Sequence, residues 1–194
     1  MIDDKDPSES TLHFILWQAL KNYSTDELIV FLKDNDYIVR TAVAKELHIR
    51  GTAKIFDEAK SLCSNDKSDV REIAAFLLGQ LGTPTFPYKN ESIPILVALL
   101  EKDGSYEVRS AAAAALGHLG SEQPIEDEVV YTSLLSRATD PAADVRACVA
   151  YALSSLKYSE EVGQTLSQLC LDENKEVQEW ATISLEIFFD KQER

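Results

Sequence analysis

Apolar side chains recur along this chain with the spacing of an amphipathic α-helix, and the helical segments come in pairs. In the second segment of each pair, the apolar residues fall on one face at 100° per residue. The first segments are also apolar-periodic and contain TDELIVFLK, AKIFDEAKSLC, ESIPILVALLEK, DEVVYTSLLSRA and EEVGQTLSQLC. The pattern predicts an all-α protein of about five helical pairs.

Aligned residues identify the pairs as copies of one unit. A Val-Arg pair occurs four times and a Val-Gln pair marks a fifth copy, with spacings of 31, 38, 37 and 32 residues. The second residue of each pair defines an Arg column: Arg40, Arg71, Arg109, Arg146 and Gln178. Six residues earlier lies an Asp column: Asp34, Asn65, Asp103, Asp140 and Asp172. Seven residues after the Arg column every copy has Leu, so these columns describe an internal repeat.

The order of Asp, Val-Arg, small residues and Leu-Gly resembles HEAT-like repeats, in particular the short bacterial type that also occurs in phycobilisome lyases. The resemblance covers about residues 24–189 and implies a right-handed α-solenoid of about five helical pairs. We expect a flexible acidic N-terminus at 1–8 and a single domain over 9–194, with a capping helix at 9–22. The units are expected at 24–50, 51–82, 91–120, 126–157 and 159–189.

The Asp and Arg columns are predicted to have structural roles. Asp or Asn at a turn can cap the helix that follows, and Arg can bridge to acidic or carbonyl groups of a neighbouring turn. Gln178 in the last copy fits a terminal unit that has no following neighbour to pair with. Small residues three and four positions after the Arg column, and Gly79 and Gly117 at the eighth, are expected to allow close helix contact.

The charge of the chain restricts its partners. The formal net charge is −14, from 33 acidic and 19 basic residues. Binding to a polyanion needs clustered Lys and Arg, so nucleic acid and anionic membrane surfaces are not expected as partners. A basic protein partner is favoured because a negative field speeds its capture, although the same charge can serve solubility alone.

The composition also bears on the compartment. The N-terminal ten residues are acidic and polar, without the basic and apolar regions of a secretory signal, and no window has about 18 consecutive apolar residues. We therefore expect a cytoplasmic protein. Cys63, Cys148 and Cys170 are widely spaced and form no CxxC pair, so reduced thiols are expected.

The face opposite the buried stripe of each second helix is the candidate partner-binding surface. It should be polar if it has no function, yet it carries apolar and aromatic residues, which is typical of a protein-binding patch. The candidates are Ile73, Phe76, Gln80, Ala114, His118, Tyr151, Ser155 and Trp180, rimmed by Glu72 and Glu179. The alternative is that curvature of the array buries these side chains against one another.

Two spacers are longer than the others, at 82–90 and 120–128, and their Pro, Gly and polar residues predict loops. Loops of repeat arrays can carry binding, so Phe86 and Tyr88 are further candidates. Equally, this loop can fold back over the neighbouring helix.

Catalysis is not expected. HEAT-type deoxyhypusine hydroxylases use His-Glu pairs as iron ligands, but His13, His48 and His118 are followed by Phe, Ile and Leu. HEAT-like alkylpurine DNA glycosylases need a basic surface, which the net charge opposes. His118 and Cys148 are the nearest approach to a catalytic pair. We therefore expect neither a cofactor nor a metal.

The sequence favours a non-catalytic protein-binding module whose apolar groove takes a basic protein. An immunity protein or inhibitor of a bacterial toxin would fit this description. One alternative is a bilin lyase or chaperone-like protein of the phycobilisome-lyase type, and a second is a structural scaffold or adaptor. The partner and the oligomeric state stay open at this point.

Overall fold

The computed structural model describes residues 7–157 and 159–190, which form eleven α-helices and one 3-10 helix. One row contains α1 (Pro7–Leu20), α3 (Tyr37–Arg50), α5 (Ser68–Gln80), α7 (Tyr106–Leu119), α9 (Ala143–Leu153) and α11 (Lys175–Asp190). The other contains α2 (Thr25–Ile29), η1 (Val30–Lys33), α4 (Ala53–Leu62), α6 (Lys89–Lys102), α8 (Glu128–Arg137) and α10 (Glu160–Leu169). The predicted all-α solenoid of helical pairs is confirmed.

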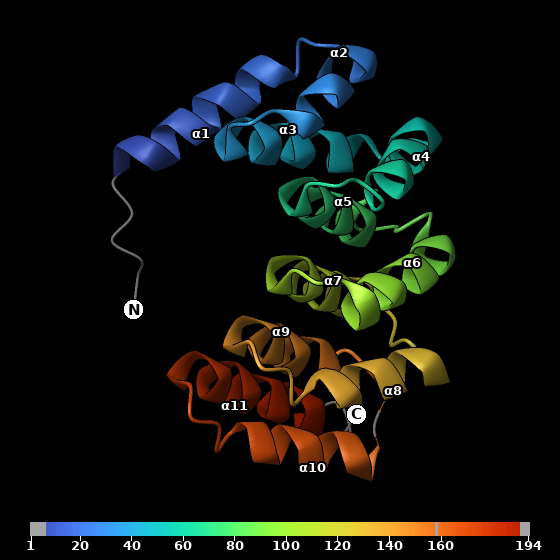
Figure 1. The fold of residues 1–194 in the computed structure, drawn as a ribbon, viewed down its shortest axis with the longest axis vertical. Helices are drawn as coiled ribbons and strands as arrows, with labels where there is room; N and C mark the ends of the chain where they lie inside the picture. Colours follow the sequence, from blue (N-terminus) through green and yellow to red (C-terminus); the bar gives the residue numbers. More distant parts are fainter. Residues whose placement is uncertain (1–6, 158, 191–194) are drawn as a thin grey trace.

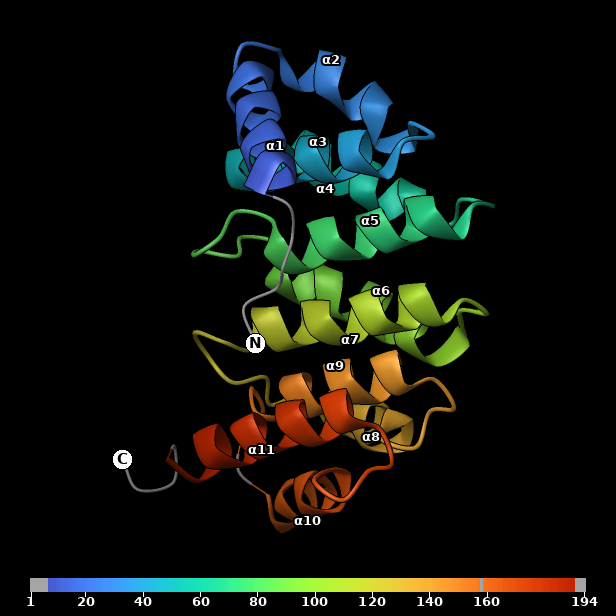
Figure 2. The same cartoon turned by 90° about the vertical axis from the view of Figure 1, so that its left-hand side faces the viewer.

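The two rows stack into a bowed array (Figure 1). The even-numbered helices lie on the convex side, and the odd-numbered helices form the inner row, which faces the viewer in Figure 2. Helix α1 begins at Pro7, so of the segment expected to be flexible, 1–8, only Pro7 and Ser8 are described, and they are helical. Helix α1 packs against α3 at one end of the inner row.

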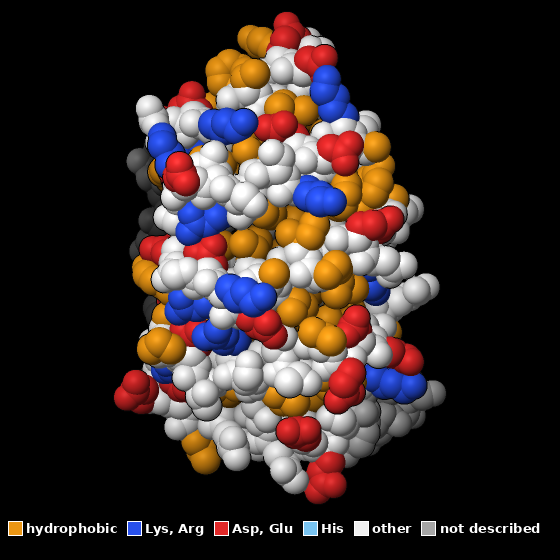
Figure 3. Space-filling model, turned by 45° about the vertical axis from the view of Figure 1, so that its right-hand side comes forward, with side chains coloured by type: hydrophobic (Ala, Val, Ile, Leu, Met, Phe, Trp, Pro, Cys, Tyr) orange, Lys and Arg blue, Asp and Glu red, His pale blue; other side chains and the backbone are white. Residues whose placement is uncertain are grey.

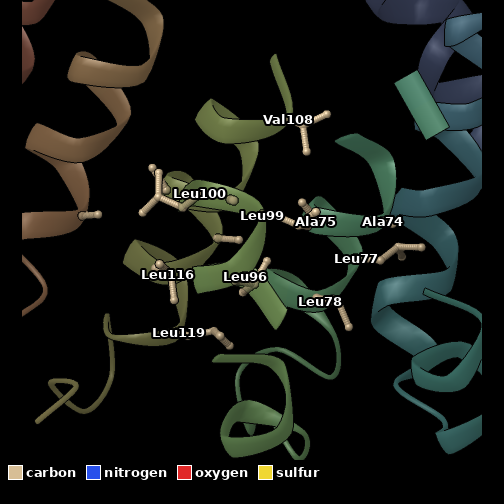
Figure 4. Close-up of a cluster of buried hydrophobic side chains, with 14 of the residues drawn as sticks. Ala74, Ala75, Leu77, Leu78, Leu96, Leu99, Leu100, Val108, Leu116 and Leu119 are labelled. Atoms are coloured by element: carbon tan, nitrogen blue, oxygen red, sulfur yellow. The ribbon is translucent and has the colours of Figure 1, made fainter. Parts of the chain in front are cut away.

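The hydrophobic core runs between the two rows. Figure 4 shows its central part, where side chains of α5, α6 and α7 interdigitate. The Leu column supplies Leu47, Leu78, Leu116 and Leu153, which are all buried. Ala112 and Ala113 are also fully buried, so part of the alanine run 111–115 belongs to the core.

Small residues let the central helices of the inner row approach closely. A Cβ atom added at Gly79 on α5 would lie 2.4 Å from Cβ of Ala115 on α7. A Cβ atom at Gly117 would lie 2.6 Å from the ring of Tyr151 on α9. Both distances are far shorter than a van der Waals contact, so neither site tolerates a side chain without movement.

The Arg column forms an ion-pair ladder along one edge of the array. Each ladder Arg contacts the Asp column of the next unit with two hydrogen bonds of 2.7–2.9 Å, a geometry that holds both planar groups in register. The pairs are Arg71–Asp103, Arg109–Asp140 and Arg146–Asp172. Each of these guanidinium groups also donates to the backbone carbonyl six residues earlier. The predicted internal role of the Arg column is confirmed.

Asn65 in the Asp column and Gln178 in the Arg column change the contacts of the ladder. Asn65 offers no carboxylate to the preceding unit, and Arg40 pairs instead with Asp69, at 3.1 Å. Gln178 keeps the contact within its own unit, because its side-chain amide donates to the carbonyl of Asp172.

The predicted capping role of the Asp column is wrong in position. Asp103 Oδ1 accepts a hydrogen bond from the backbone amide of Ser105, and it is Ser105 that caps α7. Asp140 holds the amide of Ala142, which precedes α9, in the same way. Each column residue therefore closes the turn just before the helix. Asp was expected at the N-cap because it is frequent both at N-caps and in the turns that precede helices.

We expect acidification to remove the contribution of the ladder to stability. The hydrogen bonds from Arg71 and Arg146 hold the pKa of Asp103 and of Asp172 below the usual value of an Asp side chain. A carboxyl group with a lowered folded-state pKa stabilises the fold fully above its unfolded pKa, about 3.9, and this is lost as pH falls through the folded-state pKa. Urea unfolding should therefore show declining stability below about pH 5.

The control for this pH dependence is Asp103→Asn, which cannot titrate at that position. Between pH 7 and pH 3 this variant should lose less free energy of unfolding than the wild type. Equal losses would show that the ladder does not contribute to the acid sensitivity.

The two longer spacers pack against the array. Phe86 is buried, and the half-buried Tyr88 stacks on Phe56 of α4 with ring centroids 4.8 Å apart. In the second spacer, Ile125 is buried and forms an isolated β-bridge with Leu156. Of the two alternatives for Phe86 and Tyr88, the structure therefore supports the loop that folds back.

Candidate binding groove

Residues of the inner row of helices line two adjoining hollows. This row faces the viewer in Figure 2. The first, of about 230 Å³, is lined by Thr41, Glu72, Ile73, Phe76, Gln80, Ala111, Ala114, Ala115 and His118. The second, of about 410 Å³, is lined by Ala114, His118, Asp144, Ala147, Cys148, Tyr151, Glu176 and Trp180. Ala114 and His118 belong to both, so the hollows form one continuous feature, which we call the groove.

Aromatic side chains make contacts from helix to helix along the groove. Tyr151 of α9 contacts His118 of α7 and Trp180 of α11 edge to face, with ring centroids 5.3 and 5.8 Å apart. At the other hollow, the ring of Phe76 meets that of His48 on α3 at 5.8 Å. Such edge-to-face pairs stabilise beyond the burial of area alone. They fix the shape of the groove walls.

A hydrogen bond connects the two aromatic residues at the centre of the groove. The hydroxyl of Tyr151 lies 3.0 Å from Nδ1 of His118. Burial lowers the pKa of His118 and raises that of Tyr151. Both side chains are therefore neutral near pH 7, and the phenol can donate to the imidazole nitrogen.

The structure brings together nine of the ten candidate partner-binding residues. Ile73, Phe76, Gln80, Glu72, Ala114, His118, Tyr151 and Trp180 line the two hollows of the groove. Glu179 lies beside Trp180 in an adjoining depression with Lys175, Glu176 and Ile183. Both sequence interpretations hold in part, because the aromatic side chains pack against one another and still line open hollows.

Ser155 is the exception and its assignment to this surface is wrong. Its side chain is only 4% exposed, and its hydroxyl donates to the carbonyl of Ala152. Gly120 closes over it, since a Cβ atom there would lie 2.6 Å from Oγ of Ser155. Helical periodicity placed the residue on the open face, but the loop after α7 covers that end of α9.

Asp144 and Glu176 line the larger hollow and were missed as candidates. Both stand two residues before the Arg column, a position that is acidic in four of the five units: Asp69, Glu107, Asp144 and Glu176. This recurring acidic position could have identified Asp144 and Glu176 as candidates from the sequence. Two residues at this position, Asp144 of α9 and Glu176 of α11, line the larger hollow.

The chemistry of the groove does not favour a cysteine nucleophile. Burial raises the pKa of the Cys148 thiol to about 11, and the negative charges of Asp144 and Glu176 act in the same direction. Because the thiolate is the nucleophile, this thiol is unreactive near neutral pH. Cys63 and Cys170 are also free thiols and are half-buried.

The groove is not built as a metal centre within the described residues. Across 7–157 and 159–190, no three His, Cys, Asp or Glu side chains gather as ligands for an ion. No helix in this part of the chain combines the length and apolar character needed to cross a bilayer.

Sequence comparison identifies the repeat. Residues 56–127 match the profile of the HEAT repeats family. The protein YibA of Escherichia coli K12 is 27% identical over 172 residues. That alignment covers 89% of this chain and 61% of YibA, so the chain spans less than two thirds of the length of this relative.

Solved structures with a similar fold include armadillo and HEAT-like repeat proteins. The X-ray structure of YibA has a TM-score of 0.56 at 23% identity, covering 95% of this chain and 77% of the solved chain. The CpcE and CpcF complex of phycocyanin lyase from Nostoc sp. PCC7120 has a TM-score of 0.65 at 18% identity, covering 82% of this chain and 96% of the solved one. A designed armadillo repeat protein in complex with the peptide (KR)4 has a TM-score of 0.60 at 18% identity, covering 96% and 95%. At these identities the similarity concerns the fold, which is that of a helical repeat protein, and the segment 56–127 is similar to HEAT repeats.

Proposed function

We propose that this protein is a non-catalytic binding module that takes a basic segment of a partner protein in the groove. The observation that carries the proposal is a continuous apolar and aromatic groove whose central helices, α5, α7 and α9, have no Lys and no Arg outside the ladder. The HEAT-like repeat fold itself is consistent with a protein-interaction or adaptor role. A protein-binding patch of this kind has aromatic anchors and a polar rim.

The distribution of charge supports a basic partner. Helices α5, α7 and α9 contain no Lys, and their only basic residues, Arg71, Arg109 and Arg146, are bound in the ladder. The convex side differs, because Lys and Arg are mixed with Asp and Glu where it comes forward in Figure 3. Charge complementarity to a cation is therefore concentrated on the central helices of the inner row, α5, α7 and α9.

The electrostatics of Glu72 agree with this distribution. Burial raises the pKa of Glu72, and the nearby negative charge of Glu107 raises it further. Arg40 offsets these effects only in part. A cation from a partner would relieve the repulsion between the two carboxylates. The margin of the groove is thus favourable for a positive side chain.

A solenoid of this fold can present a groove to a strongly basic peptide, since the designed armadillo protein is solved with (KR)4. For this protein, we expect the same peptide to bind with an affinity that falls as salt rises, because the screening length is about 8 Å at physiological ionic strength. An inhibitor that clamps a basic protein and an adaptor would both use this chemistry.

Replacing Ala114 with Arg should weaken binding of (KR)4 at least about tenfold, equivalent to about 1.4 kcal/mol. Ala114 lines both hollows, so a long cationic side chain there would fill the groove and repel a basic peptide. Isothermal titration calorimetry gives the Kd, and far-UV circular dichroism confirms that the variant is folded.

The matched control is Ala98→Arg on α6, which adds the same side chain at an exposed position of the outer row. We expect its Kd to stay within about twofold of wild type, because surface charges beyond the screening length contribute little. Equal Kd values for both variants would exclude the groove as the binding site.

A further inference from the structure

The larger hollow of the groove differs from the smaller one in the chemistry of its walls. Two aromatic rings, those of Tyr151 and Trp180, meet at an interplanar angle of 68° on one side. Two carboxylates, those of Asp144 and Glu176, line the same hollow. The smaller hollow has a single carboxylate, that of Glu72, among its lining residues. The larger hollow therefore offers a ligand two negative charges beside its aromatic rings.

The two carboxylates lack a counter-charge. Among the ion pairs of the described residues, neither Asp144 nor Glu176 has a Lys or Arg partner. Both add to the effect of burial in raising the pKa of the Cys148 thiol, which lines the same hollow. An apolar side chain bound there would remove water from these carboxylates without replacing its hydrogen bonds, which is costly.

A cation in the larger hollow would meet both an aromatic ring and two carboxylates. The faces of Tyr and Trp attract cations, most strongly where water is excluded. Trp180 is 40% exposed, so its ring is accessible to a bound side chain. Among protein cations, the guanidinium group is planar, stacks on aromatic faces, carries several donors in a fixed fork and is more weakly hydrated than an ammonium.

Resting on the proposed function, we propose that this hollow is the subsite for one arginine side chain of the bound segment. The guanidinium group stacks against the exposed ring of Trp180, beside Tyr151, and donates hydrogen bonds to Asp144 and Glu176. The volume, about 410 Å³, falls in the range of about 300–1,000 Å³ that is usual for ligand pockets. The subsite selects arginine over lysine within a basic segment.

The first test compares two double variants that remove the same charge. Asp144→Asn with Glu176→Gln should raise the Kd for (KR)4 at least about tenfold. The control, Asp57→Asn with Glu122→Gln, changes two exposed carboxylates outside the groove and should shift the Kd about twofold or less. These isosteric changes keep the fold, which circular dichroism verifies. Equal Kd values for the two double variants would overturn the subsite.

The second test uses the fluorescence of Trp180 in the Trp17→Phe background, which leaves one Trp in the chain. Binding of (KR)4 should change this emission. An octapeptide of Lys alone has the same charge and should bind at least about fivefold more weakly, because an ammonium group lacks the planar fork. A (KR)4 peptide with citrulline in place of Arg should bind more weakly still. Equal affinity for the Lys octapeptide and for (KR)4, or an unchanged emission of Trp180 on binding of (KR)4, would overturn the proposal.

Failure of the subsite and failure of the proposed function give different results. If only the subsite is wrong, (KR)4 still binds and Ala114→Arg still weakens it, while the Asn/Gln double variant equals its control. If the proposed function is wrong, (KR)4 does not bind the wild type, or Ala114→Arg has no effect.

Discussion

Replacing Asp140 with Ala should lower the free energy of unfolding by about 3–5 kcal/mol, the usual cost of breaking a buried ion pair from one side. The carboxylate of Asp140 has no exposed surface. It accepts two hydrogen bonds of 2.9 Å from Arg109 and one of 3.0 Å from the amide of Ala142. Its loss leaves the guanidinium of Arg109 without a counter-charge and opens the turn before α9.

Urea unfolding followed by circular dichroism measures this effect. The matched control is Glu126→Ala, which breaks an ion pair with Lys157 in which both side chains are about two-thirds exposed. Exposed pairs contribute about 0–1 kcal/mol, so this control should be nearly neutral. Equal losses in the two variants would mean that the ladder does not stabilise the array more than an ordinary surface ion pair.

Replacing Gly79 with Ala should destabilise the protein by about 1–3 kcal/mol, as expected for overpacking. The new Cβ atom would lie 2.4 Å from Cβ and 2.5 Å from Cα of Ala115, and because the second of these is backbone, α5 and α7 must move apart. The intrinsic preference has the opposite sign, since Ala is better than Gly in a helix by about 0.8–1 kcal/mol. The sign of the measured change thus reports directly on the contact.

The control for this substitution is Gly104→Ala. Nothing lies within 4 Å of a Cβ atom at Gly104, and its φ is not in the left-handed region. Ala there restricts the unfolded chain and should be neutral or stabilise by about 0.4–1 kcal/mol. A stabilising Gly79→Ala variant would show that α5 and α7 are not in close contact. Urea unfolding of both variants decides between the two outcomes.

Most of the repeat could be predicted from the sequence. The Leu column, the small residues and the Arg column each meet the same surroundings in successive units, so one residue type recurs at one offset. Gln178 was recognised as a terminal variant, and its side chain reaches only the carbonyl of its own unit. Asp34 in the first unit has no Arg of a preceding unit to pair with. Its side chain accepts a hydrogen bond from the backbone amide of Asp36, so the same column residue makes different contacts at the end of the array.

The candidate groove was predicted less completely. Helical periodicity places Phe76, Tyr151 and Trp180 on one face, because it depends only on the 100° turn per residue. How far each side chain is buried depends instead on neighbouring residues in other units. Ser155 became buried because Gly120 closes over it, and Phe86 became buried because its loop folds back.

Local residue preferences therefore established the helices, their buried faces and the ladder positions of this protein. The shape of the groove depended instead on contacts between residues more than thirty positions apart, such as Gly79 with Ala115 and His118 with Tyr151. Such contacts set how closely successive helices pack, and only in the folded array do Asp144 of α9 and Glu176 of α11 line one hollow. Periodicity describes a single helix, whereas a groove is a relation between several helices, and its chemistry follows from how they pack.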